Sequence, residues 1–454
     1  MQRHGRLAAN PGRNLAAKMD APRPDGPAAG DPVVSLADAR RLTDELFTCL
    51  EPEALLERPV PQRHRLVFYL GHLEAFDWNL LAPRIGLEAA RPGFDHLFAF
   101  GIDPARGALP SEPASAWPHA DLIREYVAET RAELDARLAD RELGFDPHQE
   151  QLLAVALEHR LMHAETLAWL ICRLPAGLKR PLVHALTPDG HAPQPARVLV
   201  PSGITTLGRP HSDPGFGWDN EYDALSLPVQ AFEIDVHDVT NGQFLRFVEA
   251  GGYEQRQHWS DDGWSWRRTR AIDHPASWRR GSDAWHLRAM WGERPLPAAW
   301  PVYVSQFEAE AYALWSGARL PTEPELQRAA FGSPEGERGS PWGDEPPDAS
   351  RGNFGFAAWD PSPAGSHPRG ASAFGVHDLV GNGWEWTSTP FEPLPGFEVF
   401  DFYPGYSRDF FDGEHCVLKG GSPRTALRLL RRSFRNWLRR GTDFAFSTFR
   451  TVRR

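Results

Sequence analysis

The sequence predicts two domains, an up-and-down four-helix bundle followed by a loop-rich α+β domain. From residue 35 to about residue 180, apolar residues recur at the three- and four-residue spacing of amphipathic helices. After residue 200 this period gives way to short alternating segments rich in Gly, Pro and Trp. A chain of 454 residues is also long enough to form two domains with separate cores.

Four segments carry the helical pattern and predict a bundle over residues 33–185. They are residues 37–57, 62–86, 121–140 and 146–174. The last segment opens with Asp146-Pro147, where an Asp cap and a Pro in the first turn are typical of a helix start. Residues 1–32 show no such pattern, and we expect a disordered tail there.

A Pro-rich stretch at residues 186–196 predicts the linker between the domains. The second domain then covers residues 197–454. It opens with the strand pattern VLVPSGITTLG, and it shows two clear helices, at residues 241–251 and 305–317. We expect a domain of short strands and long loops without an internal repeat.

Composition excludes several classes of partner. No run of about 18 apolar residues occurs, so we expect no membrane span. The net charge of -11 argues against nucleic acid as a general partner. The segment after Leu418 is rich in Arg, but Leu, Phe and Trp are interleaved with the cations, which predicts a folded segment. Cys49, Cys172 and Cys416 are too few and too far apart for a disulfide framework, which favours the cytoplasm.

Two histidines at helical spacing suggest a metal site. His159 and His163 lie four residues apart in a predicted helix, so they can chelate one ion or simply lie on one face of it. A third histidine, His72, lies in another apolar helix, where an unpaired imidazole would be costly to bury. If the two helices are neighbours, three imidazoles can hold Fe(II), Zn(II), Cu or Ni and leave positions open for substrates.

Other polar residues near these positions are weaker candidates. Glu165 is about 200° round the helix from His163, so we expect it to point away from the ion and to have a structural role. His96 could compete as a ligand, but its sequence context predicts a loop. Three further histidines are expected at the surface: His64, His119 and His148.

The order of motifs resembles a known combination of domains. A first His followed by HxxxHxE resembles the iron site of the DinB-like domain in ergothioneine-type sulfoxide synthases. The second half resembles the formylglycine-generating-enzyme (sulfatase-modifying factor) fold, a C-type-lectin-like domain. The motifs that carry this second resemblance include VPSGITTLG, GVHDLVGNGWEWT, LKGGS and FSTFR. The resemblance implies a DinB-like four-helix bundle followed by a C-type-lectin-like domain.

Formylglycine generation itself does not fit the residues. That activity uses a pair of cysteines beyond the GGS motif, whereas residues 420–437 contain none and Cys416 stands alone before them. The fusion of a three-histidine domain to this fold instead resembles the hercynine sulfoxide synthases and the selenoneine synthases. This resemblance implies Fe(II) as the cofactor, and hercynine, O2 and a chalcogen donor as the substrates.

The resemblance also implies roles for single residues. The gamma-glutamylcysteine-dependent synthase has a Tyr near its iron, and Leu394 stands at that place here. Tyr403 and Tyr406 are the nearest phenols, and we expect one of them to be catalytic. Asn436 and Trp437 match the hercynine-binding motif.

The expected donor follows from two departures from that synthase. Leu438 replaces an Asp that helps to bind the charged thiol, and Met162 replaces a Gln in the metal-binding helix. A neutral selenosugar needs no carboxylate partner, so selenium transfer is the leading hypothesis and a thiol donor is the alternative. Two rivals from other classes are a Zn-dependent DinB-like thiol transferase and a non-enzymatic binding module.

Overall fold

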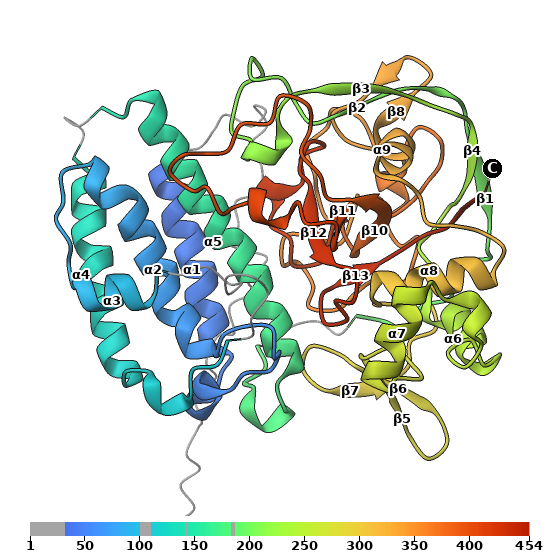
Figure 1. Cartoon of the computed structure of the whole chain (residues 1–454), viewed down its shortest axis with the longest axis horizontal. Coiled ribbons are helices and arrows are strands. Elements are labelled where there is room, and N and C mark those ends of the chain that lie inside the picture. Colours follow the sequence, from blue (N-terminus) through green and yellow to red (C-terminus); the bar gives the residue numbers. More distant parts are fainter. Residues whose placement is uncertain (1–31, 100–109, 141–143, 183–186, 454) are drawn as a thin grey trace, which may run out of the picture.

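The computed structural model describes residues 32–99, 110–140, 144–182 and 187–453. A helical domain and a mixed domain lie side by side (Figure 1). The predicted tail, residues 1–32, lies outside the described residues except for its last residue, Pro32, which begins the first helix. The described part of the predicted linker, residues 187–196, contains no helix or strand.

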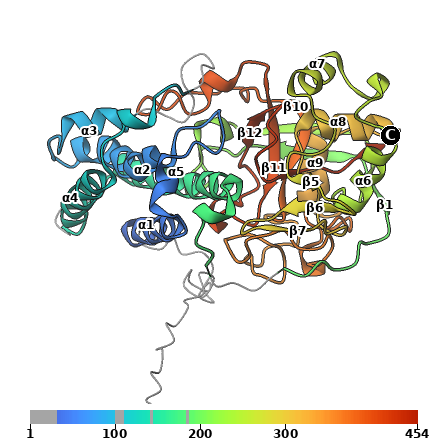
Figure 2. The same ribbon diagram turned by 90° about the horizontal axis from the view of Figure 1, so that it is seen from below.

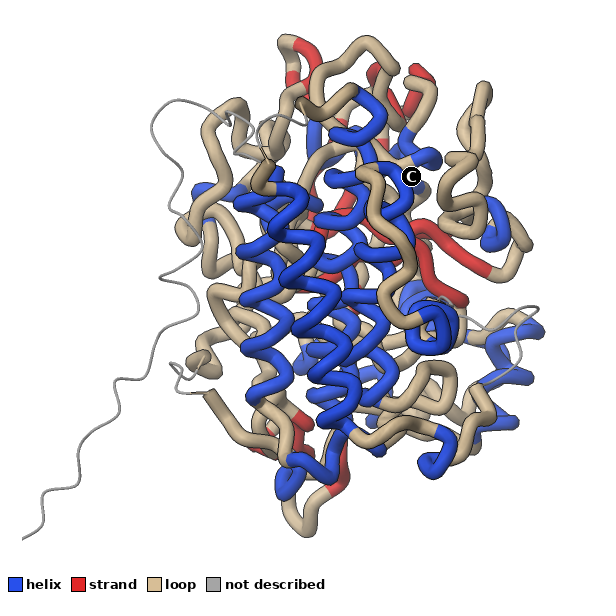
Figure 3. Tube along the Cα trace, turned by 90° about the vertical axis from the view of Figure 1, so that its left-hand side faces the viewer, coloured by secondary structure: helices blue, strands red, loops and turns tan. Residues whose placement is uncertain are grey.

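Four long helices form the first domain, as the sequence predicts. They are α1 (Pro32–Thr48), α2 (Leu66–Leu81), α4 (Ala120–Leu138) and α5 (Pro147–Arg173). The helix α5 packs against α1 and α2, and α2 packs against α4. Figure 3 looks onto this layer of helices. The prediction of a four-helix bundle is therefore confirmed.

The start of α5 is fixed by its own sequence. The Asp146 carboxylate accepts a hydrogen bond from the backbone N–H of Gln149 at 2.8 Å. The Gln149 side chain in turn accepts from the backbone N–H of Asp146 at 3.0 Å, which completes a capping box. Pro147 occupies the first turn, where its missing N–H leaves no bond unmade.

Two histidines of the first domain differ from the prediction, one in its secondary structure and one in its burial. His96 belongs to the short helix α3 (Pro92–Leu97), not to a loop, because Pro92 sets the first turn of a helix there. Its side chain is exposed. His64 was expected at the surface but is buried, and its ring stacks on Phe68 with centroids 4.2 Å apart. His119 and His148 are exposed, as predicted.

A four-stranded sheet is central to the second domain and faces α5 (Figure 1). Its strands run in the order β12-β11-β10-β13. β11 pairs with both β10 and β12 in antiparallel fashion, whereas β10 and β13 are parallel. Their bounds are β10 (Gly383–Pro390), β11 (His415–Gly421), β12 (Asn436–Arg439) and β13 (Ser447–Thr448). Viewed from below, α5 lies between the other bundle helices and this sheet (Figure 2).

Smaller sheets complete the domain and confirm the prediction of many short strands. Three strands pair in the order β1-β4-β14, and three others in the order β5-β6-β7. Two further pairs are β2-β3 and β8-β9. The bounds are β1 (Arg197–Val200), β2 (Gly203–Leu207), β3 (Leu225–Val229), β4 (Phe232–Asp235), β5 (Trp278–Arg280), β6 (Trp285–Arg288), β7 (Glu293–Pro295), β8 (Gly332–Ser333), β9 (Gly336–Glu337) and β14 (Val452–Arg453).

The second domain also contains helices that the sequence did not reveal. The predicted pair is present as α6 (Asn241–Glu249) and α8 (Gln306–Trp315). Two more, α7 (Asp261–Arg270) and α9 (Glu323–Phe331), begin at the side-chain caps Ser260 and Thr322. The segment of α7, DDGWSWRRTR, contains no aliphatic residue and so shows no aliphatic period. Short 3-10 turns are η2 (Pro52–Leu56), η3 (Ala82–Arg84), η5 (Ala114–Ala116), η6 (Ala176–Leu178), η7 (Asp219–Glu221), η8 (Arg256–His258), η9 (Pro368–Gly370), η10 (Arg408–Phe410) and η11 (Leu427–Leu429).

Within the described ranges, no helix combines the length and the apolar character that crossing a lipid bilayer requires. The longest, α5, interrupts its apolar residues with the buried charges of Glu158, Arg160 and Glu165.

Candidate metal centre

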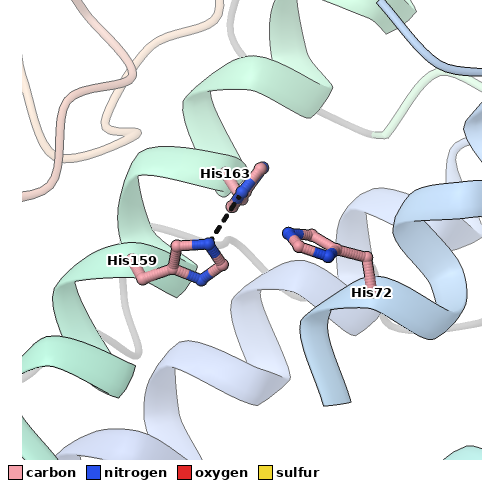
Figure 4. A group of neighbouring side chains, drawn as sticks. All are labelled: His72, His159 and His163. Carbon is pink, nitrogen blue, oxygen red and sulfur yellow. Dashed lines mark hydrogen bonds between the residues drawn. The ribbon is translucent and has the colours of Figure 1, made fainter. Parts of the chain in front are cut away.

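Three histidines converge inside the helical domain. α2 supplies His72 and α5 supplies His159 and His163, and one ring nitrogen of each lies within 4.8 Å of the others. Figure 4 shows the three rings facing a common point between the two helices. All three side chains are buried. The structure thus brings together the three residues that the sequence proposed as ligands.

The orientation of His72 leaves one nitrogen available for a metal. Its Nδ1 lies 2.7 Å from the backbone carbonyl of Phe98, so the ring donates its proton there. Its Nε2 is then a bare acceptor, and it is buried without a hydrogen-bond partner. The Nε2 atoms of His159 and His163 lie 3.1 Å apart. Converging buried acceptors of this kind fit a divalent cation, which would satisfy them together.

Burial keeps these imidazoles neutral. Removal from water lowers the pKa of His72 to about 4, against a smaller opposing effect of the Phe98 carbonyl. Burial is also the main cause that holds the pKa of His159 and His163 well below the ordinary value, and neighbouring histidines add to it. Because the neutral ring is the form that binds metal, the site needs no deprotonation near neutral pH.

Aromatic rings form the wall of the site. Phe76 stacks on His159 with ring centroids 3.4 Å apart, and Phe68 stacks on His72 at 4.7 Å. Tyr403, from the second domain, lies 6.2 Å from the His159 ring. These contacts surround the nitrogens with apolar surface and limit the access of water.

An ion pair fixes α5 against α2 beside the site. The Arg160 guanidinium donates to the carboxylate of Asp77 at 2.7 Å and to the backbone carbonyl of Leu73 at 2.8 Å. Arg160 follows His159, and Leu73 follows His72, so these bonds hold the two ligand-bearing turns at a fixed separation.

A second face of α5 binds the other domain through Glu158. This buried carboxylate accepts a hydrogen bond from the Trp218 indole at 2.9 Å and from both Nη atoms of Arg431, at 2.9 and 3.0 Å. Burial raises the pKa of Glu158, and the neighbouring Arg431 opposes this effect. The residue therefore anchors the domain boundary one position before a metal ligand.

Glu165 anchors the boundary two turns further along α5. Its carboxylate accepts from the Trp384 indole at 2.9 Å, from the Ser422 hydroxyl at 2.6 Å and from the Thr425 hydroxyl at 2.7 Å. The structure thus directs Glu165 toward the second domain and away from the three histidines. This agrees with the structural role that the sequence suggests.

The two candidate phenols lie differently around α5. Tyr406 is buried, its ring stacks on Trp218 at 3.8 Å, and its hydroxyl donates to the sulfur of Met162 at 3.6 Å. Burial raises the pKa of Tyr406 well above the ordinary value. Tyr403 is half-buried and packs against Phe76 at 5.2 Å, beside the histidines. Tyr403 is therefore the nearer phenol.

The predicted substrate-binding residues of β12 contact this region through Trp437. Its ring stacks on Phe391 at 4.4 Å and meets the Tyr406 ring edge-on at 5.2 Å. Asn436 and Leu438 flank Trp437 and project to the other face of the strand. Leu438 is buried opposite Cys416 of β11. The substrate-binding roles of these residues stay predictions.

Leu394, which replaces the Tyr of the thiol-dependent synthase, is buried in the core of the second domain. It lies beside Gly208, where an added Cβ would approach the leucine side chain to 2.6 Å. Leu394 therefore packs against the backbone at this position.

Comparisons with known proteins match two parts of the chain to two different families. Residues 35–167 match the DinB superfamily, and residues 184–454 match the family described as Sulfatase-modifying factor enzyme 1-like domain. The chain is 40% identical over 319 residues to a hercynine oxygenase of Mycobacterium tuberculosis, an alignment that covers 69% of this chain and 73% of that protein.

Two further relatives match over different lengths. A hercynine oxygenase of Mycolicibacterium thermoresistibile is 41% identical over 56% of this chain and 57% of its own. Ergothioneine biosynthesis protein 1 of Schizosaccharomyces pombe is 29% identical over 87% of this chain and 52% of its own. The chain therefore spans little more than half the length of these two relatives.

Proposed function

Because the chain belongs to the hercynine oxygenase family, with a DinB superfamily domain and a Sulfatase-modifying factor enzyme 1-like domain, we propose that it is an O2-dependent enzyme acting on hercynine. The observation that carries the proposal is the convergence of His72, His159 and His163 on one buried point. The metal in this proposal is Fe(II), which when bound supplies the redox chemistry with O2.

The proposed reaction joins a chalcogen atom to C2 of the hercynine imidazole. The C2–H bond and the chalcogen–H bond break, and a carbon–chalcogen bond forms. O2 accepts four electrons, because one oxygen atom oxidises the chalcogen and the other leaves as water with the two hydrogens. Three protein ligands suit this reaction, since they leave room for substrates beside the metal.

The residues around the histidines have defined tasks in this proposal. The neutral imidazoles hold the metal, and Phe68 and Phe76 keep water away from it. Tyr403 holds or delivers the proton that moves during bond formation, since it lies beside His159. Tyr406 is less suited to this task, because its hydroxyl is buried against Met162.

For the donor we propose a selenosugar, with a thiol as the alternative. A buried Leu438 and the thioether of Met162 offer no charge to a charged thiol, whereas a neutral sugar does not require one. Aromatic side chains such as Tyr403 and Trp437 are suited to the trimethylammonium group of hercynine.

The proposal is tested with Fe(II)-loaded protein, hercynine and O2 in separate reactions with selenoglucose, cysteine and gamma-glutamylcysteine. Mass spectrometry should show hercynine consumption and a selenium-containing product with selenoglucose. Turnover with a thiol alone would move the donor to sulfur, and no consumption with any donor would refute the function. Stoichiometric zinc without iron after anaerobic purification would instead favour the thiol transferase.

A further inference from the structure

A small cavity lies at the domain boundary, away from the histidines. It has a volume of about 40 Å³ and is enclosed by the end of α5, the sheet β5–β7 and the segments around Arg424 and Phe444. Cys172 and Arg173 form its α5 side. They follow His163 by nine and ten residues, which is roughly 14 Å along a helix. The cavity is therefore a separate site.

Arg424 brings unsatisfied hydrogen-bond donors to this cavity. Its side chain is buried, and its Nε and Nη1 atoms have no hydrogen-bond partner. The guanidinium lies over the Phe446 ring at 4.0 Å, and its Nη2 is 3.9 Å from the Asp360 carboxylate, too far for a hydrogen bond. The hydroxyl of Ser277, also in the wall, is likewise buried without a partner.

Positive charge exceeds negative charge around the cavity. Arg173, Arg288 and Arg424 line it, against Asp360 and Asp443. The Asp443 carboxylate is already paired with Arg270, which lies outside the cavity wall. Burial lowers the pKa of Arg288, and the charges of Arg279 and Arg173 lower it further. An anion would relieve this crowding of like charges.

The size of the cavity limits what it can hold. Its volume of about 40 Å³ is several times the roughly 10–15 Å³ that accommodates one water. A small oxyanion fits this space, whereas a nucleotide does not. Guanidinium N–H groups are strong donors to tetrahedral oxyanions, and the unpartnered Nε and Nη1 of Arg424, which lie on different edges of the group, can each donate a single hydrogen bond.

We propose that this cavity binds one small inorganic oxyanion of the sulfate or phosphate kind, held by Arg424, Arg288 and Ser277. The anion accepts hydrogen bonds from these donors and joins the sheet β5–β7 to the segment that carries Arg424, next to Cys172 and Arg173 at the end of α5. It thereby stabilises the second domain where that domain meets the end of α5 distant from the metal centre.

Isothermal titration calorimetry of the full chain with sodium sulfate, at an ionic strength held constant with chloride, tests this proposal. We expect saturable binding of one anion per chain, and a rise in the thermal midpoint with sulfate. Arg288→Gln, which changes a half-buried side chain, should weaken binding at least about tenfold, the loss of roughly one charged hydrogen bond. Arg424→Met should abolish it.

The matched control is Arg280→Gln, which removes an equal charge from the same sheet. Arg280 lies outside the cavity wall, with its guanidinium 4.8 Å from the Trp285 ring, so its loss should leave sulfate binding unchanged. Nonspecific stabilisation by sulfate acts on all variants alike. No saturable heat, or equal affinity in Arg288→Gln and the native chain, would mean that the cavity holds water only and would overturn the proposal. If Arg424→Met fails to fold, Arg288→Gln decides.

Discussion

Single residues of the metal centre differ in what fixes them. His72 is oriented by a carbonyl of the neighbouring chain segment, at Phe98. His159 and His163 are instead placed by the rigid spacing of one helix turn and by the ring of Phe76. A metal would thus bind a ligand set in which every ring is already held in position.

Replacing His159 or His163 by Ala should abolish stoichiometric Fe(II) binding. Each variant removes one of the three nitrogens that would bind the metal. The affinity for Fe(II) should therefore fall by more than the roughly 10–100-fold loss seen when only a residue that hydrogen-bonds to a metal ligand is removed. Metal content after anaerobic loading and desalting measures the effect. His96→Ala, at an exposed position, should keep its iron. Full iron content in His159→Ala would contradict the site.

Asp219 lies near the loop that carries Tyr403 and Tyr406, and it makes the unfolding free energy of the chain depend on pH. Its carboxylate accepts from the Ser407 hydroxyl at 2.7 Å, directly after Tyr406. Burial raises the pKa of Asp219 from 3.8 to about 6. The folded chain therefore holds this proton more tightly than the unfolded chain, so the unfolding free energy falls as pH rises from about 4 to about 6.

Asp219→Asn should remove this pH dependence. Above pH ~6 the variant should be more stable than the native chain, by up to about 3 kcal/mol, since each pKa unit corresponds to roughly 1.4 kcal/mol. The Asn side-chain carbonyl can still accept from Ser407. Urea unfolding across this pH range measures the difference, which should vanish near pH ~4. A variant less stable than the native chain above pH ~6 would show that the charged form is favoured.

At the scale of elements, α5 has separate faces for separate tasks. His159 and His163 face α2, whereas Glu158 and Glu165 face the second domain. The two glutamates are seven residues apart and so lie on one side of the helix. The metal centre and the domain boundary are therefore parts of one rigid element.

Glu158→Ala should weaken the domain boundary more than an ordinary surface change. It leaves the Trp218 indole without its acceptor and removes one of the two carboxylates that pair with Arg431, whose other partner is Glu221, so it should lower the unfolding free energy by about 2 kcal/mol. Glu150→Ala, at an exposed position in the first turn of the same helix, should change it by less than about 1 kcal/mol. Denaturant unfolding compares the two. If the two substitutions lower the unfolding free energy equally, Glu158 does not anchor the domain boundary.

The sequence allowed the local features of α5 to be predicted, and these are confirmed. The Asp146 cap and the spacing of His159 and His163 depend only on nearby residues. The partners of Glu158 could not be predicted, because Trp218 and Arg431 are 60 and 273 residues away. The residues next to a glutamate in the sequence do not determine which distant indole will donate a hydrogen bond to it.

Contacts between residues that are distant in the chain also explain why the stacking of Phe76 and the burial of His64 were not predicted. Phe76 lies four residues after His72, yet it stacks on His159 of another helix. The buried state of His64 depends on Phe68 and on its packing within the folded domain. Side-chain contacts between elements follow from packing, whereas helix starts and ligand spacing follow from the chain itself.

For the whole molecule, the shared helix predicts that metal binding stabilises both domains. Fe(II) binds only the folded site, so it raises the unfolding free energy by mass action. Tryptophan fluorescence reports mainly the second domain, since only Trp78, Trp117 and Trp169 precede the linker. Far-ultraviolet circular dichroism reports mainly the unfolding of the helices in the first domain. In the native chain, Fe(II) should raise both thermal midpoints together, because Glu158 and Glu165 of α5 are bound to the second domain.

The double variant Glu158→Ala, Glu165→Ala separates this coupling from metal binding itself. Its histidines are intact, so Fe(II) should still raise the midpoint seen by circular dichroism. The fluorescence midpoint should no longer follow, since the three hydrogen bonds to Glu165 and the contacts of Arg431 with Glu158 are lost. A fluorescence midpoint that still rises with Fe(II) would show that other contacts transmit the stabilisation. A native chain in which only the helices respond would show that the metal centre is energetically confined to the first domain.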